Sequence, residues 1–177
     1  RGQMARDMNL FVDDDGKAYH IYSSEENSTL HIAELDSSYT GYTGKYTRIF
    51  INRFMEAPAM FKKDGNYYLI VRLNSLPIGA INYMSSGNYN YATSTIASSI
   101  WGEWKELGNP CVGQDADLTF HSQSTYILPV RGKKDQFIYM GDRWTPQNAI
   151  DGRYIWLPIY FEGEKPVIKW KDSWTLD

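Results

Sequence analysis

The chain repeats one short pattern three times, and this repeat limits the folds open to it more than any other feature. In each copy an apolar, strand-like run enters a turn and returns as a second apolar run. Asp-Gly between two alternating apolar runs is the strongest short-range indication of a β-hairpin. The copies are MNLFVDDDGKAYHIYSS (8–24), PAMFKKDGNYYLIVR (58–72) and, with a longer turn, STYILPVRGKKDQFIYMGD (124–142).

Each hairpin is followed by two more strand-like segments, and no segment has a helical period with caps. These segments are 28–35 and 44–51, 89–97 and 101–107, and 152–161 and 165–174. The sequence therefore predicts an all-β chain with three units of four antiparallel strands, at about 5–52, 54–110 and 120–177. Repeated four-stranded units of about 50 residues are typical of the blades of a β-propeller. A β-sandwich would also suit many short strands, but it does not predict this repeat.

Three blades do not close a ring, because propellers have about four to eight blades. We therefore expect residues 1–177 to form part of a propeller domain, with the missing N-terminal blades upstream. The chain begins with the first strand of one blade and ends with the fourth strand of another.

Composition excludes several classes of partner and cofactor. The net charge is −3 and the basic residues are scattered, so we expect no nucleic acid. No apolar stretch approaches the ~20 residues of a membrane-spanning helix. The single cysteine, Cys111, excludes a disulfide framework, and the histidines lack metal-motif spacing, so we expect no cofactor and no metal. The 14 Tyr and 6 Trp suit strands, and such side chains also line sugar-binding clefts.

Three polar residues occupy the same place in the repeat, at the start of the first strand of each unit. Asp7 and Glu56 each lie eight residues ahead of the turn aspartate of their hairpin, and Gln123 lies twelve ahead because its turn is longer. The first strands of a propeller line its central channel. We therefore expect these three side chains to converge at one end of the channel.

The loops between second and third strands return to this same end. They are 23–28, 73–88 and 142–152, and the last two are long for hairpin connections. Long loops on a rigid scaffold often carry binding residues. They supply candidates for stacking on and hydrogen bonding to a sugar, namely Tyr83, Asp142, Arg143, Trp144, Asn148 and Asp151.

Two carboxylates facing one pocket suggest acid/base catalysis. In glycoside hydrolysis a protonated carboxyl group donates to the leaving oxygen, and a neighbouring carboxylate raises its pKa. A structural alternative stays open, in which Asp7 pairs with Arg6, Arg53 or Arg143 and Glu56 caps a turn.

Two further features carry weaker hypotheses. Asp13-Asp14-Asp15-Gly16 is similar to the start of a calcium loop but lacks the later ligands, so we expect a solvated turn. His121 could reach the channel, but we expect a buried, hydrogen-bonded histidine.

The motifs taken together resemble glycoside hydrolase family 43, and within it the galactan 1,3-β-galactosidase branch. The segments that carry the resemblance are RDMNLFVDDDGKAYHIYSS, MEAPAMFKKDGNYYLI, FHSQSTYILP and GRYIWLPI. The resemblance covers nearly the whole chain. It implies the last three blades of a five-bladed propeller, with inverting chemistry at its axis.

The resemblance also implies a role for each of the three polar residues. Glu56, in Met-Glu-Ala-Pro, matches the general acid. Asp7, in Arg-Asp-Met-Asn, matches the aspartate that tunes the pKa of that acid and orients the substrate. Gln123, in His-Ser-Gln-Ser, matches a glutamine that positions or activates water in place of a carboxylate base. An amide is a poor base, so we expect water positioning, with base action through an imidic tautomer as the alternative.

Two departures from the family pattern affect the expected activity. Another active-site glutamate of the branch belongs to the upstream blades, and residues 71–90 differ from the loop expected after the general-acid strand. Three functions therefore stay open: an inverting exo-β-1,3-galactanase acting on plant-type galactan, an arabinofuranosidase or xylosidase, and a non-catalytic glycan-binding propeller. The resemblance implies a polysaccharide or oligosaccharide substrate, a secreted or periplasmic protein, and at most a structural calcium ion.

Overall fold

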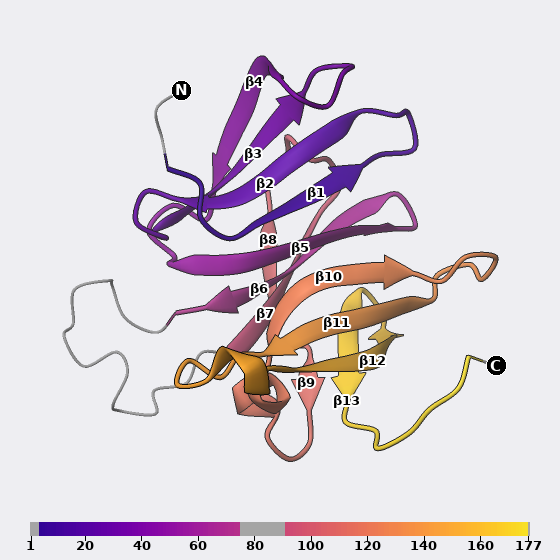
Figure 1. Cartoon of the computed structure of the whole chain (residues 1–177). Coiled ribbons are helices and arrows are strands. Elements are labelled where there is room, and N and C mark those ends of the chain that lie inside the picture. Colours follow the sequence, from indigo (N-terminus) through magenta and orange to yellow (C-terminus); the bar gives the residue numbers. More distant parts are fainter. Residues whose placement is uncertain (1–3, 75–90, 177) are drawn as a thin grey trace.

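The chain folds into three separate, mainly antiparallel sheets that follow one another in space in the order of the sequence (Figure 1). The computed structural model describes residues 4–74 and 91–176. Helical structure in this part of the chain consists of two short 3₁₀ segments, η1 (Ala116–His121) and η2 (Ala149–Asp151). The prediction of an all-β chain is confirmed.

The strands of each sheet are consecutive in the sequence. The first sheet has the order β1 (Met8–Val12), β2 (Ala18–Ser24), β3 (Thr29–Leu35), β4 (Tyr42–Ile49). The second has the order β5 (Met55–Lys63), β6 (Asn66–Leu73), β7 (Tyr91–Ala97), β8 (Lys105–Gly108). The third has the order β10 (Gln123–Pro129), β11 (Phe137–Arg143), β12 (Arg153–Glu162), β13 (Lys165–Lys169), β9 (Cys111–Val112).

The third sheet contains a fifth strand that the sequence did not predict. β9 pairs with β13 in parallel, and the Ile168 amide donates to the Pro110 carbonyl oxygen at 2.8 Å. The chain that leaves the second sheet at β8 thus runs along the outer edge of the third sheet before it reaches β10. Because an edge strand presents unpaired backbone groups, this pairing both covers the edge and links two sheets.

Two predicted strands are shorter than expected. The predicted segment 101–107 begins as a turn, in which the Gly102 amide donates to the Ser99 carbonyl at 2.9 Å, so β8 starts only at Lys105. The last predicted segment, 165–174, ends its strand pairing at Lys169.

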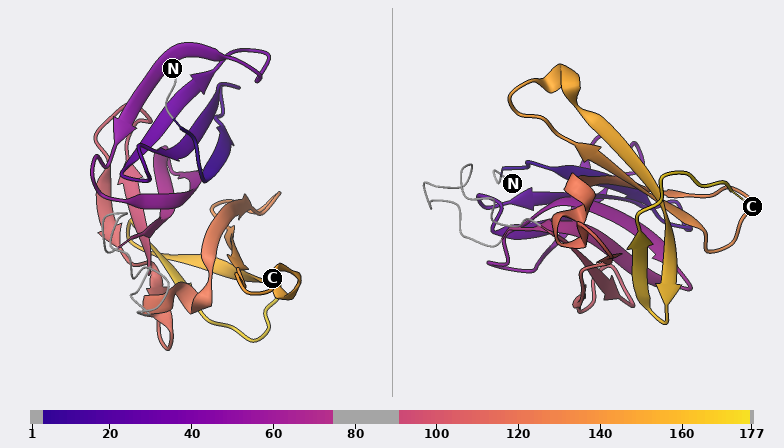
Figure 2. Two further views of the ribbon diagram at one scale, coloured as in Figure 1. Left: turned by 60° about the vertical axis from the view of Figure 1, so that its left-hand side comes forward. Right: turned by 90° about the horizontal axis from the view of Figure 1, so that it is seen from below.

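β6 of the middle sheet is buried on both faces because consecutive apolar residues of a strand point to opposite faces of its sheet. Tyr68 and Ile70 of β6 belong to the core shared with the third sheet, while Leu69 and Val71 belong to the core shared with the first sheet. The three sheets together follow an arc, seen most clearly in the left view of Figure 2.

Buried polar side chains join β1, β5 and β10, which are the strands that open the three hairpins. Asn9 of β1 accepts a hydrogen bond at Oδ1 from the Met60 amide of β5 at 3.2 Å. Ser124 of β10 donates from Oγ to the carbonyl oxygens of Ala57 at 2.6 Å and Ile70 at 3.3 Å. These bonds hold β1, β5 and β10 next to one another, which determines where their ends meet.

The link through Ser124 leads to a stability prediction. Replacing Ser124 by Ala leaves two buried carbonyl oxygens with fewer donors, so we expect the free energy of unfolding to fall by about 1–3 kcal/mol. The side chain of its neighbour Thr125 is exposed, and its hydroxyl group donates to the Met140 carbonyl within the same sheet. Thr125→Ala should therefore change the free energy by no more than about 0.5 kcal/mol. Urea denaturation of the full-length protein measures both, and equal losses would contradict this account of the interface.

Candidate active site

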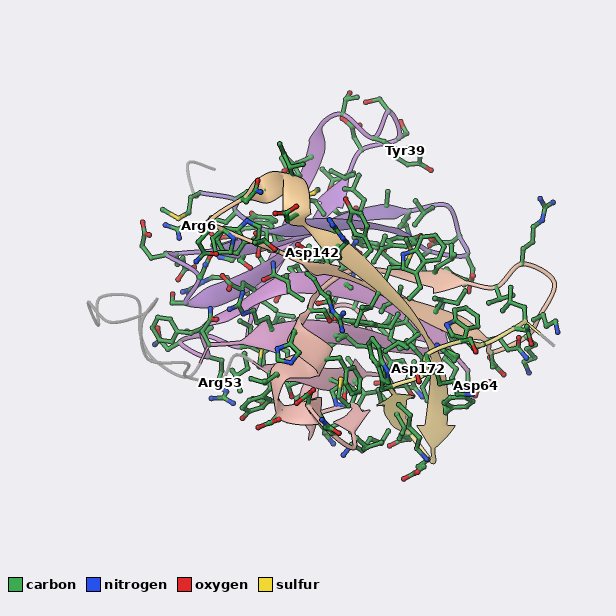
Figure 3. The ribbon with its side chains drawn as sticks, turned by 60° about the horizontal axis from the view of Figure 1, so that its bottom comes forward. Arg6, Tyr39, Arg53, Asp64, Asp142 and Asp172 are labelled. Carbon is green, nitrogen blue, oxygen red and sulfur yellow. The ribbon has the colours of Figure 1, made fainter. Side chains whose placement is uncertain are left out.

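The starts of β1, β5 and β10 meet at one end of the molecule, as the repeat predicted. Asp7 directly precedes β1, Glu56 is the second residue of β5, and Gln123 opens β10. Gln123 Nε2 donates to Asp7 Oδ2 at 3.4 Å. Figure 3 shows Arg6 and Arg53 at this end of the sheets and Asp64, in the β5–β6 turn, at the other.

An irregular backbone at Ala57 sets the direction of Glu56. Glu56 pairs with Arg72 and Ala59 with Ile70, so two residues of β5 face one of β6 in a β-bulge. Pro58 lacks an amide hydrogen and is tolerated there. Ala57 has φ +52°, a left-handed conformation that costs about 1–2 kcal/mol for a residue with a Cβ atom. Asp7 Oδ2 offsets this cost by accepting a hydrogen bond from the Ala57 amide at 3.2 Å.

Glu56 is mostly buried among polar partners, with 14% of its side chain exposed. Asn27 Nδ2 donates to Glu56 Oε2 at 2.6 Å, and Arg72 Nη1 lies 3.6 Å from Oε1. Burial raises the pKa of Glu56, and the nearby charge of Asp7 raises it further. Arg72 and a hydrogen bond from Asn74 lower the pKa but do not cancel the effect of burial. A carboxyl group of this kind holds its proton to higher pH than an ordinary glutamate, as a general acid must.

Asp142 adds a third carboxylate to this cluster. It lies opposite Gln123 in the β10–β11 pairing. Burial raises the pKa of Asp142, with a further contribution from Asp7. Its Oδ1 atom is buried and has no hydrogen-bond partner within the described ranges. Because buried carboxylate oxygens normally accept a hydrogen bond, we expect a donor from outside the described residues, such as water or a ligand, to bind Oδ1.

Sequence reasoning missed three residues that contact Glu56: Asn27, Arg72 and Asn74. Asn27 reaches Glu56 from a turn in which Glu25, Glu26 and Asn27 are all left-handed, with φ of 51°, 58° and 61°. Three successive left-handed residues are not a pattern that sequence propensity predicts.

The arginines proposed as ion-pair partners of Asp7 are bound elsewhere. Arg6 pairs with Glu26, and Arg53 forms a two-pronged contact with Glu106 at 2.7 and 2.9 Å. Arg143 donates to the Phe120 carbonyl oxygen at 3.1 and 2.9 Å, and its guanidinium lies 4.9 Å from the centre of the Trp170 ring. The structural alternative for Asp7 is therefore wrong for all three arginines.

The loop 142–152 presents one aromatic side chain to solvent and is held by contacts of its own. Trp144 is 64% exposed. Asn148 Oδ1 accepts from the Ile150 amide at 3.3 Å, and its Nδ2 donates to Asp151 Oδ2 at 2.6 Å. Tyr83, the other aromatic candidate, lies outside the described residues.

The turn Asp13–Gly16 does not fit a calcium ion. Lys62 Nζ lies 2.6 Å from Asp13 and 2.8 Å from Asp14, while Lys17 pairs with Asp15 at 2.8 Å. Ammonium groups thus neutralise the carboxylates that a cation would need. Across residues 4–74 and 91–176, no group of three or more His, Cys, Asp or Glu side chains is placed to hold a metal ion.

Two other sequence features have a structural explanation. The prediction that His121 is buried is wrong: its side chain is 60% exposed, 3.5 Å from Asp115, because the left-handed run Thr119–His121 turns it outward. Burial raises the pKa of the Cys111 thiol to about 12, so it is no nucleophile. In the described part of the chain, no helix is long and apolar enough to cross a membrane.

The raised pKa of Glu56 makes stability depend on pH. The folded protein binds the Glu56 proton more tightly than the unfolded chain does, so the free energy of unfolding falls as pH rises above the ordinary value of 4.5. Glu56→Gln removes this loss. We therefore expect the difference in Tm between the variant and the unmodified protein to grow in favour of the variant from pH 4 to pH 7.

Parallel thermal melts at the two pH values measure this difference. Glu106→Gln, which changes the exposed partner of Arg53, serves as the matched control and should show no such gain. A Glu56→Gln advantage that does not grow with pH would contradict the burial argument.

Comparison with known proteins identifies the family. The family model for glycosyl hydrolases family 43 matches residues 1–142. A family 43 β-1,3-galactosidase solved with galactodeoxynojirimycin is 54% identical, with a TM-score of 0.88, over 99% of this chain and 48% of that chain. A second family 43 β-1,3-galactosidase is 35% identical, with a TM-score of 0.88, over 99% of this chain and 35% of that chain.

An exo-β-1,3-galactanase from Clostridium thermocellum is 31% identical, with a TM-score of 0.76, over 95% of this chain and 34% of that chain. A search of curated proteins finds no match. The chain thus spans half or less of the length of these solved structures. The expected resemblance is confirmed, and the chain belongs to glycosyl hydrolases family 43.

Proposed function

We propose that the complete protein is an inverting, exo-acting glycosidase that hydrolyses β-1,3-linked galactan of the plant type. The observation that carries the proposal is the buried Glu56, whose pKa is raised beside Asp7 at the point where three sheets meet. The similar solved proteins are β-1,3-galactosidases and an exo-β-1,3-galactanase, which supports galactose as the sugar.

Each of the three polar residues has a distinct role in this proposal. Glu56 is the general acid and gives its proton to the leaving glycosidic oxygen. Asp7 keeps the pKa of Glu56 raised, fixes the bulge through the Ala57 amide, and orients the sugar. Gln123 positions the water that attacks the anomeric carbon from the opposite face as the bond to the leaving oxygen breaks, and the proton that the attacking water loses passes to solvent.

The remaining predicted residues are proposed to bind the substrate. Asp142 offers its Oδ1 atom, which has no hydrogen-bond partner among the described residues, to a donor such as a sugar hydroxyl group, and Trp144 offers an exposed ring for stacking. Arg143 and Asn148 support this loop through the contacts described above. Tyr83 completes the proposed set from its own loop.

We further propose that these sheets are three blades of a five-bladed propeller and that other parts of the same protein close the ring. The arc of the three sheets supports this arrangement (Figure 2). Both outer sheets also have an open apolar face: Met8, Leu10 and Val12 of β1 are 46–55% exposed, and Tyr154, Trp156 and Tyr160 of β12 are 42–78% exposed. Since the substrate is a polymer that does not enter cells, we place the protein outside the cytoplasm, secreted or periplasmic.

The catalytic proposal predicts the behaviour of Glu56 variants of the full-length protein. Glu56→Gln should lower kcat on β-1,3-galactan by about 10²–10⁴-fold, the usual contribution of general acid catalysis. The loss should be smaller on an aryl galactoside whose phenol leaves without protonation. Glu106→Gln is the control and should keep normal activity, and a normally active Glu56→Gln variant would refute the role of Glu56.

A panel of substrates distinguishes the competing functions. Release of galactose with inverted anomeric configuration, followed by NMR, is the expected result. Preferential hydrolysis of an arabinofuranoside or xyloside would assign a different substrate within the family. Glycan binding without turnover would indicate a non-catalytic propeller.

Ring closure predicts that the open face of β12 is covered in the complete protein. Tyr154→Lys should then bury a charge and lower the free energy of unfolding of the full-length protein by about 2 kcal/mol or more. Ile51→Lys, at a 51% exposed position between the first two sheets, is the control and should change the free energy by no more than about 0.5 kcal/mol. Equal, small effects in chemical denaturation would contradict ring closure at this face.

A further inference from the structure

Arg72 of β6 lies between the proposed acid and the proposed water-positioning residue. Its Nη1 atom donates to Gln123 Oε1 at 2.6 Å and lies 3.6 Å from Glu56 Oε1. Its side chain is 24% exposed, so solvent screens these contacts only in part. One cation therefore contacts two residues of the site that come from different sheets.

The two neighbours of Gln123 leave its amide only one favourable orientation. Arg72 is a pure donor and meets the amide oxygen, while the Asp7 carboxylate is an acceptor and meets the amide nitrogen at 3.4 Å. Rotating the amide by half a turn would place two donors face to face and two acceptors face to face. The charges on both sides therefore hold the amide in the orientation described.

We propose that Arg72 is a positioning residue that holds Gln123 in its amide form, with the NH₂ group facing Asp7, so that Gln123 acts on water as a hydrogen-bond donor. This inference rests on the glycosidase function proposed above. An imidic tautomer would need a proton on Oε1, and that proton would face the guanidinium donors. Action of Gln123 as a base is thus opposed by its own partner.

Arg72 also changes the pKa of Glu56, the proposed acid. In the described part of the chain, the charged groups that influence Glu56 are Arg72 from β6, with Asp7 and Arg6 from the segment before β1. Asp142 of β11 is itself influenced by Asp7, which raises its pKa, and by Arg72, which lowers it, and the contacts from Asn27 and Asn74 to Glu56 are neutral amides. Arg72 lowers the pKa of Glu56, so its removal takes away one of the effects that oppose burial and Asp7. The pKa of Glu56 should then rise.

The test uses three arginine variants of the full-length protein. Arg72→Met should lower kcat by about tenfold to a hundredfold through misplacement of Gln123, and should move the alkaline limb of the kcat/KM profile to higher pH. Arg72→Lys keeps the charge and should restore the position of the limb and part of kcat. Arg53→Met, at the ion pair with Glu106, should change neither quantity.

Two further readouts separate this inference from the proposed function. A carbon-13 NMR titration of the Glu56 carboxyl group needs no turnover, and Arg72→Met should move the midpoint to higher pH. Gln123→Glu removes a donor and supplies a true base, so the donor role predicts a loss of kcat of at least about tenfold.

A Gln123→Glu variant as active as the unmodified protein, or more so, would overturn the donor role. If neither the alkaline limb nor the titration midpoint moves in Arg72→Met, the proposed role of Arg72 is overturned. This holds even if kcat and Tm both fall, because a joint fall indicates only a structural contact. If the unmodified protein hydrolyses no substrate in the panel, the glycosidase proposal fails, and the titration alone then decides whether Arg72 controls Glu56.

Discussion

The candidate site depends on the peptide units around Ala57, which two neighbouring sheets hold from opposite sides. The Asp7 carboxylate from the first sheet accepts from the Ala57 amide, and the Ser124 hydroxyl from the third sheet donates to the Ala57 carbonyl. Both bonds are made to a residue in a left-handed conformation within a bulge. Without them the strand would relax toward regular pairing, and Glu56 would turn away from the point where the sheets meet.

The electrostatics of the site follow from that geometry. Burial disfavours the charged form of Glu56, Asp7 adds to this effect, and Arg72 opposes it. Burial is the largest of these effects, so the carboxyl group keeps its proton to higher pH than an ordinary glutamate does. Such an arrangement lowers the free energy of unfolding at neutral pH but keeps a proton on the carboxyl group. Groups with shifted pKa values of this kind are common at functional sites.

The sequence repeat was enough to predict the order of strands in each sheet and the meeting of Asp7, Glu56 and Gln123, because Asp-Gly turns set the register of the hairpins. It was not enough to find Arg72. Counting back from the Asp64-Gly65 turn in a regular hairpin places Leu73 opposite Glu56, and the bulge shifts that partner by one residue to Arg72. The parallel pairing of β9 was missed because it joins segments far apart in the chain, and Asn27 because its left-handed turn has no glycine.

We propose that the three strand starts form one sugar-binding catalytic site. A crystal structure of the full-length protein with galactodeoxynojirimycin, the ligand of the 54% identical galactosidase, tests it most directly. We expect the iminosugar to bind against Asp7 and Glu56, with Gln123 facing the side from which water attacks. A ligand bound elsewhere, with no contact to any of these three side chains, would contradict it.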